Sequence, residues 1–173
     1  MELFKCPEKC CTLKIEPYVD KKDPDAKIKR TKKKAGMFII DPSTGKILIV
    51  QSRGKLWGPP KGAIEHGETE VKCAIREVKE ETGLNIVVND KTKAVKIKER
   101  STYYYVEIPE CEVNIQNNVL YNDVNAIGWI KPKCLGQCIE NGNIFVTQQC
   151  RIVLTKYLNY YLPSTSFVLA NRK

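Results

Sequence analysis

The strongest constraint on the fold is an amphipathic helix that the sequence predicts over residues 69–82. At about 100° per residue, the apolar side chains of this stretch share one face of a helix. They are Val71, Ala74, Ile75 and Val78. Cys73 falls on the same side, where we expect a small buried side chain. Gly83 follows directly and is the residue type that most often ends a helix. One face of this helix must therefore pack against another layer.

Short β-rich segments around the helix predict that other layer. Apolar runs at residues 36–40 and 46–50 flank a turn sequence at residues 41–45, which together predict a hairpin. The remaining expectations are strands at 101–108 and 124–130, an amphipathic helix at 148–162, and a loop rich in glycine and proline at 52–67. Strands that alternate with two long helices predict an α/β fold with a mixed β-sheet between helices.

The charge of the 173-residue chain favours polyanionic partners, because 29 Lys and Arg against 20 Asp and Glu give a net charge of +9. The single histidine, His66, excludes sites that need two histidine ligands. No apolar run approaches the roughly 18 residues of a membrane span, and the N-terminus lacks a secretion signal, so we expect a cytoplasmic protein without a membrane partner. The Asn, Ile and Lys content is compatible with an AT-rich genome such as a virus, which would make the compartment the host cytoplasm.

A second face of the predicted helix is acidic. Spacings of three and four residues bring Glu77, Glu80 and Glu81 together, where their charges repel one another. Hard oxygen ligands crowded in this way suit Mg²⁺ or Mn²⁺. An ion pair between Glu68 and Arg76 would fix the preceding loop against the helix. A glycine in that loop, Gly62, would let the backbone approach and offer a carbonyl to the same metal.

These residues carry a family resemblance. The pattern Gly62, five residues, Glu68, seven residues, Arg76-Glu77-Val78, one residue, Glu80-Glu81, one residue, Gly83-Leu84 resembles the Nudix box at every fixed position. The resemblance implies an α/β/α sandwich with a mixed sheet, and hydrolysis of a nucleoside diphosphate linked to another moiety. It also implies metal ligation by Glu77, Glu80, Glu81 and the Gly62 carbonyl, with one glutamate able to act as base. Arg76 and Glu68 would then be orienting residues.

Residues beside the box resemble several Nudix subfamilies. The segment 57–62, Trp-Gly-Pro-Pro-Lys-Gly, is similar to mRNA-decapping enzymes, and its Pro-Pro-Lys-Gly part also to diadenosine polyphosphate hydrolases. Residues 73–83 resemble decapping enzymes, including those of large DNA viruses. The resemblance implies substrate contacts by Trp57 and by Lys61, which would face the phosphate chain. It places Asp123 where decapping enzymes carry a further catalytic carboxylate, usually Glu; the alternative is a turn residue.

Two further segments leave more than one substrate class compatible with the sequence. Residues 100–106 resemble the strand after the box in diphosphoinositol polyphosphate hydrolases. In a diadenosine hydrolase, Tyr103 and Tyr105, which share one face of a strand, would stack on adenine; packing within a half-buried sheet is the alternative. The basic residues of 27–34 with Lys93, Lys96 and Lys98 could track an RNA backbone. We therefore predict a Nudix pyrophosphohydrolase that removes the mRNA cap as m7GDP, with these two substrate classes, or an RNA- or cap-binding module without turnover, as alternatives.

The N-terminal region and the cysteines complete the predictions. Residues 1–34 are expected to form a basic extension or a first strand region, and residues 35–173 the Nudix domain. Eight cysteines in a chain without a secretion signal predict free thiols in a reducing compartment. Two pairs with equal spacing, Cys6 with Cys10 and Cys134 with Cys138, could alternatively supply four sulfur ligands to a structural zinc. No protein partner can be inferred.

Overall fold

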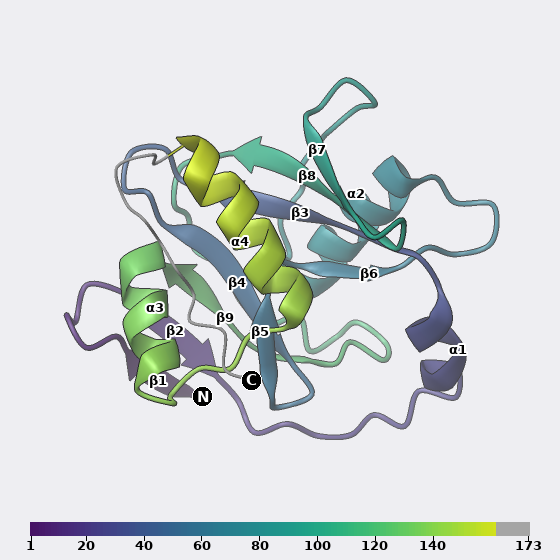
Figure 1. Cartoon of the computed structure of the whole chain (residues 1–173). Helices are drawn as coiled ribbons and strands as arrows, with labels where there is room; N and C mark the ends of the chain where they lie inside the picture. The colour runs from purple at the N-terminus through teal and green to yellow at the C-terminus, as the bar shows by residue number, and fades with distance from the viewer. Residues whose placement is uncertain (162–173) are drawn as a thin grey trace.

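The computed structural model describes residues 1–161, apart from the side chains of residue 30 and residues 158–161. The described range contains nine strands and four helices. Figure 1 shows how they are arranged. In chain order they are β1 (Glu2–Lys5), β2 (Thr12–Ile15), α1 (Ala26–Thr31), β3 (Lys34–Ile40), β4 (Ile47–Ser52), β5 (Leu56–Gly58), β6 (Lys61–Ala63), α2 (Glu70–Thr82), β7 (Ala94–Ile97), β8 (Ser101–Glu107), β9 (Val124–Ile130), α3 (Pro132–Glu140) and α4 (Gln148–Tyr161).

The strands form one mixed sheet in the order β1-β2-β9-β4-β3-β8-β7, with β5 beside β4 and β6 beside β3. Only β3 and β8 are parallel; the other pairs in this sheet of the described residues are antiparallel. Helix α2 covers one face, and α3 and α4 cover the other (Figure 1). The predicted α/β fold, a mixed sheet between helices, is confirmed.

The two faces of the sheet carry separate cores. Strand β8 shows the alternation: Tyr103 packs in the core under α3 and α4, and Tyr104 packs in the core under α2. Tyr105 returns to the first of these cores, where its ring lies 5.0 Å from that of Tyr157 on α4. Tyr157 also stacks on Phe38 of β3, with ring centroids 4.6 Å apart. The predicted period of two in this strand is therefore confirmed.

Helix α2 has the boundaries that its sequence predicts, within one residue. The Thr69 hydroxyl oxygen accepts a hydrogen bond from the Lys72 N–H at 3.3 Å and caps the helix start. Gly83 adopts a left-handed conformation, with φ at 78°, and its N–H donates to the Lys79 carbonyl. The helix buries Cys73, as expected. Its position against β3 and β6 places the acidic face beside the loop that precedes it.

Other expectations need correction. The segment 52–67 is not a simple loop, because β5 and β6 lie within it and extend the sheet. Within the N-terminal region, where only an extension or a first strand was expected, most of residues 27–34 form the short helix α1. Strands β3 and β4 pair at one position, Ile40 with Ile47, while β6 pairs with the first three residues of β3 and β8 pairs with all seven. The predicted strands at 101–108 and 124–130 and the helix at 148–162 are confirmed, although residue 162 lies outside the described residues.

The N-terminal region contains a hairpin of β1 and β2, and β2 joins the sheet by pairing with β9. Both strands are four residues long, and β1 is almost entirely exposed, so no alternation of apolar residues marks them in the sequence. None of the helices within residues 1–161 has the length and apolar character to cross a membrane.

Candidate active site

Arg76 organises the acidic face of α2. Its Nη1 donates to Glu77 Oε1 at 2.8 Å and to Glu80 Oε2 at 3.1 Å. Its Nε and Nη2 bind both oxygens of Glu68, at 2.8 and 2.9 Å, in the two-pronged geometry that a guanidinium allows. Nη2 also donates to the Ala63 carbonyl at 3.1 Å. One side chain thus ties the loop before α2 to two of the three carboxylates.

Glu68 is held by Arg76 on one side and by its own loop on the other. The Arg76 guanidinium, by hydrogen bonding to its carboxylate, lowers the pKa of Glu68 despite partial burial. Glu68 also accepts a hydrogen bond from the Glu65 N–H at 3.0 Å, which fixes the loop conformation. The predicted ion pair between Glu68 and Arg76 is therefore present in the structure.

Glu77 and Glu81 are held in a partly dehydrated environment. Glu81 is 6% exposed, and its Oε2 accepts a hydrogen bond from the Lys61 N–H at 2.8 Å. Burial raises the pKa of Glu81 well above its usual value, and the nearby Glu77 charge raises it further. Burial also raises the pKa of Glu77, against the lowering effect of Arg76. Two carboxylates that disfavour their own charge are suited to a cationic ligand.

Gly62 is required where the loop meets Glu77. A Cβ on Gly62 would overlap the Glu77 carboxyl group, so any larger residue would displace it. The Gly62 carbonyl accepts a weak hydrogen bond from the Cys73 thiol, with 3.7 Å between oxygen and sulfur. The three glutamates of this face are hard oxygen donors of the kind that suits Mg²⁺ or Mn²⁺. Two of them lie against the Gly62 loop, Glu77 at Gly62 itself and Glu81 at the Lys61 N–H.

Basic residues border the carboxylates. Burial lowers the pKa of Lys34, and the positive charge of Lys61 lowers it further, whereas Asp123 and Glu77 have the opposite effect. Lys34 and Lys61 therefore lie within electrostatic range of each other and of the acidic face. Lys29 of α1 pairs with Asp23 at 3.0 Å and is also influenced by the Glu77 charge. These cations surround the acidic face with positive charge.

Asp123 lies near this group with its own partner. Its Oδ2 accepts a hydrogen bond from Arg53 Nε at 2.7 Å, and its charge contributes to the raised pKa of Glu81. The neighbouring Asn122 is buried and donates from Nδ2 to the Glu80 carbonyl at 3.0 Å. The turn therefore brings Asp123 toward the carboxylates, while a catalytic role for Asp123 stays a prediction.

The aromatic residues considered for substrate binding are placed differently. Trp57 is 2% exposed and Tyr103 is 1% exposed, and both belong to the core under α3 and α4. The Tyr103 hydroxyl donates a hydrogen bond to Gln149 Oε1 at 3.3 Å. Tyr105 is half-buried in the ring stack with Tyr157, and its hydroxyl donates to Glu107. These rings pack within the protein, which agrees with the packing alternative rather than with stacking on a base.

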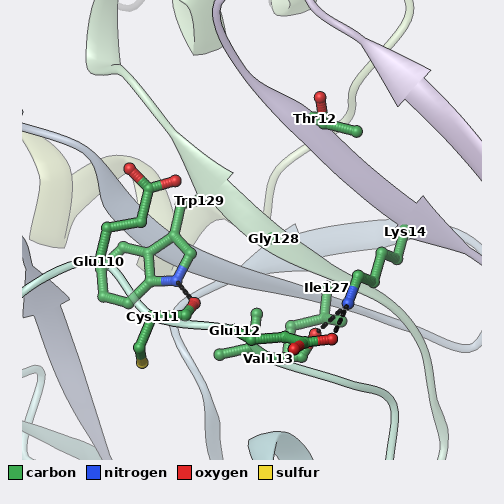
Figure 2. A pocket seen from close by; sticks show the side chains of 9 residues that line it. All are labelled: Thr12, Lys14, Glu110, Cys111, Glu112, Val113, Ile127, Gly128 and Trp129. Atoms are coloured by element: carbon green, nitrogen blue, oxygen red, sulfur yellow. Dashed lines mark hydrogen bonds and ion pairs between the residues drawn. The ribbon is translucent and has the colours of Figure 1, made fainter.

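A shallow pocket lies elsewhere, beside β2 and β9 (Figure 2). None of the predicted site residues lines it. Its Lys14 ammonium binds the Val113 carbonyl at 2.9 Å and the Asn114 side chain at 2.7 Å, and the Trp129 indole N–H donates to the Cys111 carbonyl. The polar groups of this pocket therefore stabilise the segment that crosses β9.

The sequence did not point to Lys34 or Asn122 as parts of the site. Lys34 begins a buried strand at the end of a basic run, and that boundary between charged and apolar residues is the one signal that sets it apart from the lysines before it. Asn122 fixes the C-terminal part of α2 from a turn 42 residues away, so no local pattern reveals it.

Comparison with known proteins agrees with this geometry. The family described as NUDIX domain matches residues 30–143. "Putative hydrolase 111R" of Invertebrate iridescent virus 3 is 34% identical over 139 residues, which cover 78% of this chain and 80% of that protein. The m7GpppN-mRNA hydrolase dcap-2 of Caenorhabditis elegans is 40% identical over 62 residues, which cover 34% of this chain but only 8% of dcap-2.

The asymmetrical bis(5'-nucleosyl)-tetraphosphatase of Mus musculus is 30% identical over 108 residues, which cover 53% of this chain and 67% of the mouse protein. Among solved structures, a MutT NUDIX hydrolase from Burkholderia pseudomallei superposes with a TM-score of 0.53 at 20% identity, and covers 71% of this chain and 95% of its own. That likeness supports the fold. Together, the matched family and the carboxylate geometry show that the chain belongs to the Nudix hydrolase family.

Proposed function

We propose that the protein is a metal-dependent Nudix pyrophosphohydrolase that removes the cap of mRNA and releases m7GDP. The observation that carries the proposal is the acidic face of α2, held by Arg76 and bordered by Lys34 and Lys61. The carboxylates provide a site for divalent cations, and the surrounding lysines favour a substrate with several phosphates. The local likeness to dcap-2 favours the cap among such substrates.

Nudix hydrolases generally use divalent metal ions, and the donor set of this chain fits Mg²⁺ or Mn²⁺. Glu77, Glu80, Glu81 and the Gly62 carbonyl would hold the metal. When bound, such an ion neutralises phosphate charge and lowers the pKa of an attacking water. The remaining contributions come from the chain itself. Arg76 orients Glu77 and Glu80 through hydrogen bonds. Burial raises the pKa of Glu81, so its carboxylate can take a proton from water.

Lys61 has a double role in this proposal. Its backbone N–H fixes Glu81, and its ammonium would bind the phosphate chain. Lys34 adds a second positive charge from the adjacent strand β3. Both lysines would stabilise charge that develops on the leaving phosphate oxygens. Longer RNA would reach the exposed lysines in and directly after α1, Lys27, Lys32 and Lys33, whose contribution would weaken as salt rises.

A second candidate substrate is a dinucleoside polyphosphate, favoured by the broader match to the mouse tetraphosphatase. The packing of Tyr103 and Tyr105 within the protein counts against it, since those rings were the expected base-stacking residues. The burial of Trp57 likewise removes a contact expected for the cap. A diphosphoinositol polyphosphate would also suit the basic border, but no relative named above carries that activity. A binding module without turnover would not need the three carboxylates.

The test is a comparison of substrates with Mg²⁺ and with Mn²⁺. Capped RNA labelled in the cap phosphate, diadenosine tetraphosphate and a diphosphoinositol phosphate would be incubated with the same enzyme preparation. Release of labelled m7GDP at a rate well above both small substrates supports decapping. Faster hydrolysis of a small substrate would reject the cap and retain the site. Binding of capped RNA with no hydrolysis of any substrate would support the binding module instead.

A further inference from the structure

Four cysteine sulfur atoms come together outside the acidic face of α2. Three of them, Cys6, Cys10 and Cys11, lie in the turn between β1 and β2, and Cys134 lies in the first turn of α3. Cys10 Sγ is 3.7 Å from Cys6 Sγ, 3.6 Å from Cys11 Sγ and 3.5 Å from Cys134 Sγ. All four sulfur atoms lie within 4.8 Å of one another. We call this group the cysteine cluster.

These spacings match the ligand shell of a tetrahedral metal. A Zn–S bond of about 2.3 Å places the sulfur atoms of a tetrahedron roughly 3.8 Å apart. The three distances from Cys10 fall close to that edge length. A disulfide would need an S–S separation of about 2.05 Å, and all eight cysteines are free thiols in the structure.

Backbone N–H groups point at the sulfur atoms, as expected for thiolates. The Cys11 N–H donates to Cys6 Sγ at 3.3 Å, and the Lys131 N–H donates to Cys11 Sγ at 3.3 Å. Such bonds orient metal ligands and favour their charged form. Cys134 lies in the first turn of α3, which directs its sulfur atom toward the turn between β1 and β2.

The turn that carries three of the cysteines is fixed by its own backbone. The Lys9 N–H donates to the Cys6 carbonyl at 2.8 Å, and the Cys6 N–H donates to the Cys11 carbonyl at 3.1 Å. Lys9 adopts a positive φ of 58°, which closes the turn. Two ammonium groups lie within electrostatic range of the sulfurs, Lys46 near Cys10 and Cys11, and Lys133 near Cys10 and Cys134. They would offset the net negative charge of four thiolates around Zn²⁺.

We propose that Cys6, Cys10, Cys11 and Cys134 bind one Zn²⁺ as a closed structural site. Four soft sulfur ligands select zinc over Mg²⁺ or Mn²⁺, and four protein ligands leave no open position for catalysis. The site would fasten the β1–β2 hairpin to α3. Three of its ligands precede the family match, which begins at residue 30, so the site is an addition to the family domain.

The proposal corrects the expected ligand pairs. Cys138 lies one turn beyond Cys134 on α3, but it is not in the cysteine cluster. Its side chain is fully buried in the core under α3 and α4. Cys11 takes the fourth ligand position instead of Cys138. The hairpin turn brings the consecutive residues Cys10 and Cys11 next to Cys6.

The first experiment measures zinc in the full chain, produced with zinc and reductant and then dialysed against EDTA to strip ions held by carboxylates. We expect one zinc per chain by elemental mass spectrometry. The Cys10→Ala variant, which removes an exposed ligand, should retain at least tenfold less zinc. The matched control is Cys111→Ala, an exposed cysteine outside the cluster, which should retain one zinc. Glu81→Gln should also retain it, since the ion is not at the acidic face.

Two further measurements guard against a variant that misfolds. Cobalt-loaded wild-type protein should show sulfur-to-cobalt charge-transfer bands and the intense d–d bands of a tetrahedral centre. In the zinc-loaded wild type, alkylation of Cys10 should be at least tenfold slower than that of Cys111, although both are exposed. Folded wild-type protein without zinc or cobalt bands, or with equal alkylation of the two cysteines, would overturn the proposal. Loss of zinc in a folded Cys138→Ala variant would overturn the assigned ligand set.

Discussion

The acidic face of α2 and the cysteine cluster are both groups of metal-ligating side chains, but they are assembled in opposite ways. The acidic face comes from one contiguous segment, residues 62–84, in which helix periodicity brings three glutamates together. The cysteine cluster joins Cys10 to a residue 124 positions away. A local segment can be read from the sequence, whereas a site that depends on how a hairpin docks on a distant helix cannot.

The two groups also differ in what holds them together without a ligand. Arg76 links Glu77, Glu80 and Glu68, so positive charge already offsets the repulsion at the acidic face. The cysteine cluster is held by N–H bonds to sulfur and by the turn backbone. We expect loss of a carboxylate to affect hydrolysis most, and loss of a cysteine to affect stability most.

The largest effect is expected for Glu81→Gln. The variant keeps the shape of a buried side chain but removes the charge that a cation and a water proton require. Hydrolysis should fall by at least about 100-fold. Initial rates with Mg²⁺ and with Mn²⁺ measure it, on whichever substrate the wild type turns over.

The matched control for that variant is Glu70→Gln on the same helix. Glu70 lies in the first turn of α2, two turns before Glu77, where it pairs with Lys96 at 3.7 Å instead of joining the Arg76 network. The hydrolysis rate of Glu70→Gln should remain within a factor of about two of the wild type. The surface ion pair between Glu70 and Lys96 contributes little to stability, so the variant should fold normally. Unchanged turnover in a folded Glu81→Gln variant would reject the assignment of the acidic face as the active site.

The next effect is expected for Gly62→Ala. The added Cβ would overlap the Glu77 carboxyl and shift a ligand, and displacement by about 1 Å can cost roughly 10- to 100-fold in rate. Steady-state kinetics on the folded variant measure the loss. Gly58→Ala is the matched control, because its Cβ would meet Cys150 at an ordinary 3.5 Å. Equal rates for the two variants would mean that the close approach of loop and helix has no catalytic role.

The success of sequence-based prediction follows the same division. Helix α2 and its caps were predictable because Thr69, the apolar stripe and Gly83 lie within one short segment. Strands β5 and β6 were not, since each is three residues long and is defined by its pairing with β4 or β3. For the same reason, no boundaries for β1 and β2 could be predicted within the N-terminal region. Local periodicity finds long elements, and pairing between distant segments decides the short ones.

Within the candidate site, the sequence predicted the ion pair within the motif but not the placement of aromatic residues outside the motif. The positions of Glu68 and Arg76 followed from spacing, and their ion pair is present. The burial of Trp57 and Tyr103 did not follow, because an aromatic residue near a motif looks the same whether it packs inward or faces a ligand. Only the packing of α4 over β8 and β5 decides between these alternatives.

Removal of zinc should reduce stability by an intermediate amount. If the cluster binds zinc as proposed, Cys10→Ala frees the hairpin from α3, and a loss of about 2 kcal/mol corresponds to roughly 4–8 °C for a chain of this size. Thermal unfolding followed by circular dichroism measures the midpoint, with Cys111→Ala as control. An unchanged midpoint in Cys10→Ala would show that the hairpin stays docked without the metal.

The smallest effect is expected for Glu68→Gln, in how the free energy of unfolding depends on pH below neutrality. Hydrogen bonding to Arg76 lowers the pKa of Glu68 in the folded protein, so its contribution is present above the unfolded pKa of about 4.3 and is lost as pH falls toward the lower folded value. At neutral pH, Glu68→Gln should lower the free energy of unfolding by about 0.5–1.5 kcal/mol, the net contribution of a typical hydrogen bond, because glutamine keeps an acceptor oxygen for Arg76. This difference from the wild type should shrink as the pH is lowered through that window.

Urea unfolding at a series of pH values measures this dependence. Glu65→Gln is the control, because Glu65 is exposed and the bonds described for it come from its backbone: its N–H donates to the Glu68 carboxylate and its carbonyl accepts from the Glu68 N–H. Its unfolding free energy should track that of the wild type at every pH. A Glu68→Gln difference that does not change with pH would mean that the ion pair with Arg76 contributes no net stability. The loop before α2 would then be fixed by its backbone bonds, and the acidic face would resemble the cysteine cluster in how it is held.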